Sequence, residues 1–256
     1  MARTKAFLPF IAVLLALSGC SAFFSFNAFS SLDKASVPNP SRYQGPGGLA
    51  NLQSDLASKA IVNALKGDLT TVNIILSNLD ASYNVKTGPL TTPDQQTAAI
   101  LYSDLALKST SGDILVNNVV ATIMTQAPGN LQSILSSIVP ADVAADFAKF
   151  DDMMNELLVA NSVYTNLGNS TPLPVPGMNM GDVAQKAAVA YLMQKVFDRV
   201  HLVDAGTEIA EMFALVNNQA NNIANLNTIP ADPLNPLSAV PWLKNIFDAA
   251  GAPYPA

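Results

Sequence analysis

Residues 140–164 read PADVAADFAKFDDMMNELLVANSVY, the longest periodic stretch of this chain. Seven positions recur at alternating spacings of four and three residues: Val143, Phe147, Phe150, Met154, Leu157, Asn161 and Tyr164. Positions three and four apart lie on one face of an α-helix, so the pattern predicts a helix with a continuous buried stripe. We therefore expect this stretch to form the central helix of the fold.

Helical spacing continues on both sides of this stretch. Asp68 and Thr92-Pro93 stand where helix N-caps and first-turn prolines are favoured. The helices expected from such signals cover approximately residues 49–65, 69–79, 93–107, 113–123, 131–138, 140–164, 182–200, 207–219 and 241–247. No segment shows convincing alternation with the period of two that a half-buried β-strand requires. The chain is therefore predicted to be all-α.

Three of the expected helices begin with the same pair of residues, at Gly67-Asp68, Gly112-Asp113 and Gly181-Asp182. A repeat of helical hairpins would produce this similarity and would stack the helices as an irregular α-solenoid. Independent use of a common helix-start signal would produce it too, in a multi-helix bundle. Either architecture would contain about eight or nine helices.

The composition restricts the classes of partner. Charged residues make up 12% of the chain, about half of the ~25% that is usual in globular domains. Without residues 1–19, which hold two of the 13 basic residues and none of the 19 acidic ones, the net charge is 11 − 19 = −8. A chain so acidic, with no basic run, is a poor electrostatic match for nucleic acid.

The N-terminus has the order of a secretory signal peptide. Arg3 and Lys5 precede an apolar run over residues 6–16, which is followed by small residues. The run is shorter than the ~20 apolar residues that span a bilayer. Leu17-Ser18-Gly19-Cys20 then resembles the lipobox of bacterial lipoproteins, and Cys20 is the only cysteine of the chain. An ordinary signal peptide that ends near a cysteine is the alternative.

The lipoprotein resemblance implies removal of residues 1–19 and a diacylglyceryl group on the Cys20 thiol. Two acyl chains suffice for stable anchoring, whereas one is marginal. Ser21 stands where an aspartate would signal retention at the inner membrane, so the resemblance implies the outer membrane, facing the periplasm. Acylation of Cys20 would leave no thiol for a disulfide.

Residues 20–48 are expected to form the lipidated N-terminus and a flexible tether. The segment from Phe23 to Phe29 contains four phenylalanines, which could lie in the membrane interface or in the domain core. Residues 36–48 are rich in Pro, Gly and Ser and lack a period, which is typical of a linker. Residues 49–256 are then expected to form a single all-α domain.

Residues with catalytic or metal-binding potential are few. His201 is the only histidine, and no Gly-x-Ser-x-Gly motif accompanies it. Its place near the end of an expected helix suits an interaction with exposed carbonyl groups. Asp151, Asp152 and Glu156 form the densest acidic cluster but lack the histidine, thiol or calcium-loop pattern of a metal site. We therefore expect no catalytic residue, no metal and no cofactor.

The most economical hypothesis is a non-enzymatic, membrane-anchored envelope lipoprotein whose helical domain binds a protein partner. The alternative is a carrier or sensor of an apolar small molecule or lipid held between helices. Low charge and wide apolar helix faces favour that alternative, and a dry cavity of ~300 Å³ or more would be expected beside Ala187, Leu192, Met193 and Val196.

Overall fold

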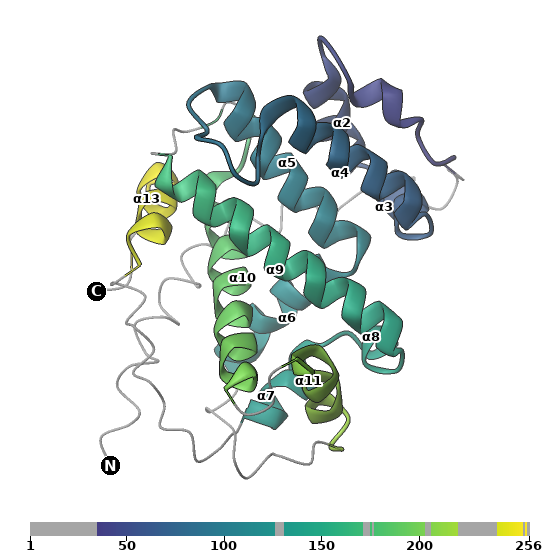
Figure 1. Cartoon of the computed structure of the whole chain (residues 1–256), viewed down its shortest axis with the longest axis vertical. Coiled ribbons are helices and arrows are strands. Elements are labelled where there is room, and N and C mark those ends of the chain that lie inside the picture. The colour runs from purple at the N-terminus through teal and green to yellow at the C-terminus, as the bar shows by residue number, and fades with distance from the viewer. Residues whose placement is uncertain are drawn as a thin grey trace.

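The computed structural model describes residues 35–125, 131–170, 175, 177–202, 206–219, 240–252 and 254. Across these residues the protein is helical, and no strand is found, which confirms the all-α prediction (Figure 1). The elements are the 3-10 helix η2 (Pro40–Tyr43) and the α-helices α2 (Gly48–Leu56), α3 (Lys59–Lys66), α4 (Leu69–Tyr83), α5 (Pro93–Ser109), α6 (Gly112–Thr125), α7 (Leu131–Ile138), α8 (Ala141–Ala144), α9 (Phe147–Asn169), α10 (Met180–His201), α11 (Glu208–Val216) and α13 (Pro241–Ala249).

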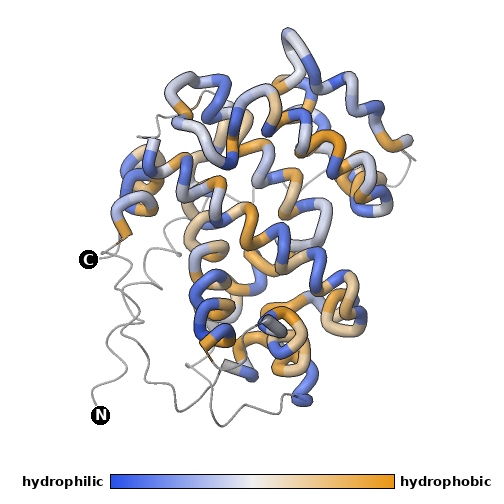
Figure 2. The backbone as a smooth tube through the Cα atoms, in the orientation of Figure 1, coloured by the Kyte–Doolittle hydropathy of each residue, from blue (hydrophilic) through white to orange (hydrophobic). Residues whose placement is uncertain are grey.

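Helix α9 is the centre of the fold, as the sequence predicts. It runs through the middle of Figure 1 and packs against its neighbour α10 and against α5, α11 and α13, which come from more distant parts of the chain. In a solenoid each unit would contact only its neighbours. The described helices therefore form a bundle around α9. Figure 2 shows hydrophobic and hydrophilic stretches alternating along this helix, as a helix with one buried side requires.

The central helix is shorter than predicted at its N-terminal end. Val143 lies on the separate short helix α8, and α9 begins only at Phe147. The Asp146 carboxylate caps α9 by accepting hydrogen bonds from the N–H groups of Ala148 and Lys149. A capping aspartate satisfies amide groups that have no partner within the helix, so it favours a new start at this point.

The helix expected over residues 49–65 is likewise two helices. Helix α2 ends at Leu56 and α3 begins at Lys59, with Ser58 between them as an N-cap. The Ser58 hydroxyl accepts a hydrogen bond from the N–H of Ile61. In both cases a short polar residue inside an apolar period interrupts the helix, because its side chain bonds to the backbone.

The three Gly-Asp pairs do not share one cap geometry. Asp68 caps α4 through its bond with the Thr71 N–H, but Asp113 lies within the first turn of α6. Helix α10 is capped by Asn179, and Asp182 lies inside it. The shared Gly-Asp dipeptide therefore occurs at three different kinds of helix start and gives no support to a structural repeat.

The start of the domain differs from the tether expected over residues 36–48. Within that range, residues 40–43 form η2, and Tyr43 is only 5% exposed. The Tyr43 hydroxyl donates a 2.9 Å hydrogen bond to the buried carboxylate of Asp55, and the guanidinium of Arg42 lies 3.4 Å from the same carboxylate. A buried aromatic ring and a buried acid with two partners hold this segment against α2. The folded domain thus begins near residue 40 rather than at residue 49.

This attachment can be tested with Tyr43→Phe. We expect the variant to lower the free energy of unfolding by about 1.5–3 kcal/mol, because it removes a hydrogen bond to a buried charged group. Chemical denaturation followed by circular dichroism measures this loss. Tyr83→Phe, at a partly buried tyrosine of α4, is the matched control and should change stability by less than about 0.5 kcal/mol. Equal effects of the two substitutions would contradict the attachment of residues 40–43 to α2.

Candidate functional site

The residue with the clearest predicted chemistry lies outside the described residues. Cys20, the signal peptide over residues 1–19 and the segment from Phe23 to Phe29 all precede residue 35. Lipidation of Cys20 therefore remains a prediction from the lipobox resemblance.

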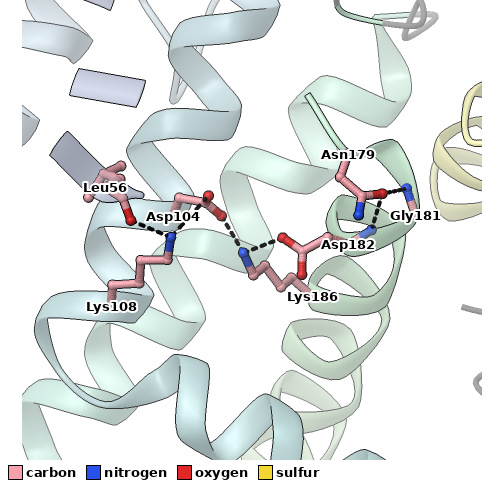
Figure 3. Close-up of polar contacts among 7 residues, drawn as sticks. All are labelled: Leu56, Asp104, Lys108, Asn179, Gly181, Asp182 and Lys186. Carbon is pink, nitrogen blue, oxygen red and sulfur yellow. Dashed lines mark hydrogen bonds and ion pairs between the residues drawn. The ribbon is translucent and has the colours of Figure 1, made fainter. Parts of the chain in front are cut away.

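Within the described domain, the most unusual polar arrangement is a buried ion-pair network between α5 and α10. The side chain of Lys186 is only 7% exposed. Its Nζ lies 2.7 Å from Oδ1 of Asp104 on α5 and 2.6 Å from Oδ2 of Asp182 one turn earlier on α10 (Figure 3). The Lys186–Asp104 pair joins α5 to α10 through two residues that are 82 positions apart in sequence.

A second lysine extends the network towards α2. The Nζ of Lys108 lies 4.0 Å from the Asp104 carboxylate and donates a 3.0 Å hydrogen bond to the carbonyl oxygen of Leu56. Figure 3 shows this chain of contacts running from the end of α2, through α5, to the start of α10. The network therefore ties three helices together through charge-assisted bonds.

The electrostatics of this network oppose acid–base or nucleophilic catalysis. Burial alone would lower the pKa of Lys186, but the charges of Asp104 and Asp182 outweigh it and raise the pKa above its ordinary value. Burial, reinforced by the charge of Asp104, likewise raises the pKa of Tyr164 on α9. A lysine held as ammonium cannot act as a base or nucleophile. The arrangement acts as an electrostatic link within the core.

Lys186 and Asp104 are not among the residues predicted from the sequence. A local signal exists, because Lys186 is the one charged residue in the otherwise neutral run from Val183 to Gln194. Asp182 also lies four residues before it, at the spacing of a helical ion pair. The partner on α5 carries no such signal, since its proximity follows from the packing of the helices.

His201 links two helices. It is the last residue of α10, as expected, but its Nδ1 contacts Oε1 of Glu208 in the first turn of α11 rather than a helix carbonyl. The same oxygen accepts a 2.9 Å hydrogen bond from the N–H of Gly206. These contacts, the Gly206 bond foremost, lower the pKa of Glu208 to about 2. Nδ1 of the histidine is therefore engaged by a carboxylate that stays ionised at neutral pH.

The acidic cluster lies on α9, as the sequence predicts. Burial is the main cause that raises the pKa of Glu156; the charge of Lys86 lowers it, and that of Asp152 raises it further. Burial also raises the pKa of Asp152, with the charge of Asp151 adding to it. Among the described residues, no group of three or more His, Cys, Asp or Glu side chains is placed to hold a metal ion.

The residues suggested for an apolar ligand all lie on α10, and two of them are part of the hydrophobic core. Ala187 and Met193 are buried in the core, and Leu192 and Val196 are partly buried. A surface hollow of about 400 Å³ lies instead on α4 and is lined by Thr70, Asn73, Ile74, Ser77 and Asn78. This hollow is open to solvent rather than enclosed between helices, so it is not the dry cavity that the apolar-carrier alternative requires.

Two further observations bear on the protein as a whole. No helix in the described ranges combines the length and hydropathy needed to cross a bilayer. Comparisons with models of known protein families, with curated proteins and with solved structures give no match.

Proposed function

We propose that the protein is a bacterial envelope lipoprotein, anchored through lipid on Cys20, whose helical domain binds a protein partner in the periplasm. The observation that carries the proposal is the order of residues 1–20: a basic start, an apolar run and Leu17-Ser18-Gly19-Cys20. The domain's own contribution is a helical surface brought to the membrane, where tethering raises its local concentration.

The described domain supports a binding role over a catalytic one. Its buried lysine is fixed as an ammonium by two carboxylates, and a carboxylate of α11 engages Nδ1 of its histidine. These groups strengthen contacts between helices, which is what a scaffold presenting a surface needs. The apolar-carrier alternative receives no comparable support, since the hollow on α4 is open to solvent rather than enclosed between helices.

Lipidation is tested by comparing the full chain with its Cys20→Ser variant in a bacterial host. We expect the wild-type protein to incorporate an alkyne-labelled fatty acid and to sediment with membranes, because two acyl chains give stable anchoring. Cys20→Ser should lose the label and retain residues 1–19 or become soluble. Labelling that persists in Cys20→Ser, or a wild-type N-terminal peptide without lipid in mass spectrometry, would refute the anchor.

The membrane address is tested with Ser21→Asp. By the lipobox resemblance, the wild-type protein should fractionate with the outer membrane on a density gradient and Ser21→Asp with the inner membrane. Ser21→Thr is the matched control and should leave the distribution unchanged. Inner-membrane localisation of the wild type would remove the outer-membrane part of the proposal while leaving the anchor in place.

The binding role is tested by crosslinking the lipidated protein in its native envelope and identifying what is captured. We expect one protein to be recovered reproducibly, and to be lost when the bundle is destabilised by the core substitutions discussed below. Recovery of a small apolar compound without any protein would instead favour the carrier alternative.

A further inference from the structure

The charges of the mature chain are unevenly distributed along its sequence. Residues 35–67, here called the N-terminal edge, hold Arg42, Lys59 and Lys66 against one acidic residue, Asp55, a net charge of +2. Residues 68–256 hold 17 acidic and seven basic residues, a net charge of −10. The part of the domain that follows the proposed anchor most closely therefore has the opposite sign to the rest.

The structure gathers the N-terminal edge into one place. It consists of η2, α2 and α3, and α2 contacts both of the others. Figure 1 shows these elements at one end of the molecule, well separated from α11 and α13. Two of the edge's three basic side chains are accessible: Lys59 is exposed and the Arg42 side chain is 50% exposed. Asp55, the acid that pairs with Arg42, is only 4% exposed.

Two of these three basic groups are paired with carboxylates. The Nζ of Lys66, whose side chain is 25% exposed, lies 3.6 Å from the Asp113 carboxylate, and the guanidinium of Arg42 lies 3.4 Å from that of Asp55. The positive field of the edge therefore comes mainly from Lys59. Helix α3 also begins with Lys59 and contains no acidic residue, so its exposed side carries no opposing charge of its own.

We propose that the N-terminal edge faces an anionic phospholipid surface and directs the acidic remainder of the domain away from the membrane. The inference rests on the lipid anchor proposed above. Residues 20–34 span at most about 50 Å when extended, enough to let several faces reach the bilayer. The tether alone thus does not select a face, but charge does. A basic residue near an anionic surface is attracted, and the acidic body is repelled over about a Debye length.

Lysine footprinting on vesicles tests this orientation. The thiol of Cys20, the only cysteine of the chain, is coupled in the mature protein to a maleimide lipid, so the geometry is imposed whether or not cells lipidate the residue. Acylation by an amine-reactive reagent is then measured by mass spectrometry for each lysine. The measured quantity is its rate on phosphatidylglycerol-rich vesicles divided by its rate on phosphatidylcholine vesicles.

Lys195 on α10 and Lys244 on α13 are internal references, because both are exposed and lie on the acidic remainder. We expect the ratio for Lys59 to fall about fivefold below theirs, the population change expected for one basic residue near the surface. The difference should vanish at about 0.5 M salt, where the Debye length is about 4 Å. Equal ratios for the three lysines, or protection of Lys195 or Lys244 instead, would overturn the proposal.

Charge reversal provides the matched pair of variants. Lys59→Glu reduces the charge of the edge from +2 to zero and places an acid at a helix N-terminus, where it is tolerated. Lys66, the other lysine of the edge, should also be protected in the wild-type protein, and we expect Lys59→Glu to abolish that protection. Lys195→Glu changes the total charge by the same amount and should leave protection of Lys59 intact. If both variants act alike, net charge rather than the edge controls the effect, and the inference fails. Failure of lipidation in cells, by contrast, would leave this result unchanged.

Discussion

Lys186→Met is expected to lower the free energy of unfolding by about 3 kcal/mol, at the lower end of the range for breaking a buried ion pair. The substitution keeps the length of the side chain but leaves Asp104, 15% exposed, without its closest cation. Lys108 is 4.0 Å away from that carboxylate and can compensate only in part. Asp182, whose side chain is 40% exposed, is solvated and adds little. Chemical denaturation measures the change, with the dependence of the unfolding free energy on denaturant concentration fitted for each variant.

Two comparisons make this expectation specific. Lys195→Met, on the same helix but in an exposed pair with Asp198, should cost less than about 1 kcal/mol. Adding Asp104→Leu to Lys186→Met removes the stranded charge and should recover a large part of the loss, since apolar replacement of a buried pair is often close to neutral. A Lys186→Met variant as stable as Lys195→Met would show that the network contributes no net stability.

The pH dependence of this effect has a defined sign. The pKa of Lys186 is raised on folding from 10.5, so the native state binds its proton more tightly than the unfolded state. The stabilisation is therefore fully present below about pH 10.5 and is lost as the pH rises beyond that value. The stability difference between wild type and Lys186→Met should accordingly narrow at strongly alkaline pH.

Gly168→Ala is the second substitution for which we expect a large effect, a loss of about 2–3 kcal/mol from overpacking. Inside an accommodating helix the same change stabilises by about 1 kcal/mol. At Gly168, however, α13 crosses α9 so closely that a Cβ atom would lie 2.2 Å from the carbonyl oxygen of Trp242. Backbone cannot move aside as a flexible side chain can. The steric term therefore exceeds the helix propensity and reverses its sign.

The fluorescence of Trp242 reports on the effect of Gly168→Ala. Trp242 is the only tryptophan of the chain, is partly buried and meets Tyr191 edge to face with ring centroids 6.0 Å apart. Displacement of α13 should shift its fluorescence to longer wavelength as stability falls. Gly67→Ala is the control, because a Cβ there would meet only the Ala64 carbonyl oxygen at 3.5 Å. Stabilisation by Gly168→Ala would contradict the close crossing.

The candidate sites were predictable to different extents. The resemblance to a lipobox is visible in the sequence because such a signal is a short linear segment and needs no tertiary contact to define it; lipidation of Cys20 stays a prediction. The positions of His201 near a helix end and of the acidic cluster on the central helix also follow from local periodicity. The Lys186–Asp104 pair does not, because the two residues are 82 positions apart and their attraction exists only once α5 and α10 pack.

The sequence by itself determined the all-α class and most helix starts. Helix-start signals involve only three or four neighbouring residues, so they can be recognised in the sequence. Examples are the N-caps Asp68 and Thr92 and the first-turn Pro93. The sequence also predicts lipidation of Cys20, which lies outside the described residues.

Only the tertiary structure decided three other features: the attachment of residues 40–43, the bundle arrangement around α9 and the contact of Gly168 with Trp242. Each depends on which surfaces meet. A proline- and glycine-rich segment is predicted to be a linker, but Tyr43 in it bonds to the buried Asp55. A glycine inside a helix is predicted to be destabilising, but Gly168 is required because another backbone lies against it. Such contacts form between residues that are distant in sequence. A local sequence pattern describes each residue separately and does not show which two will meet.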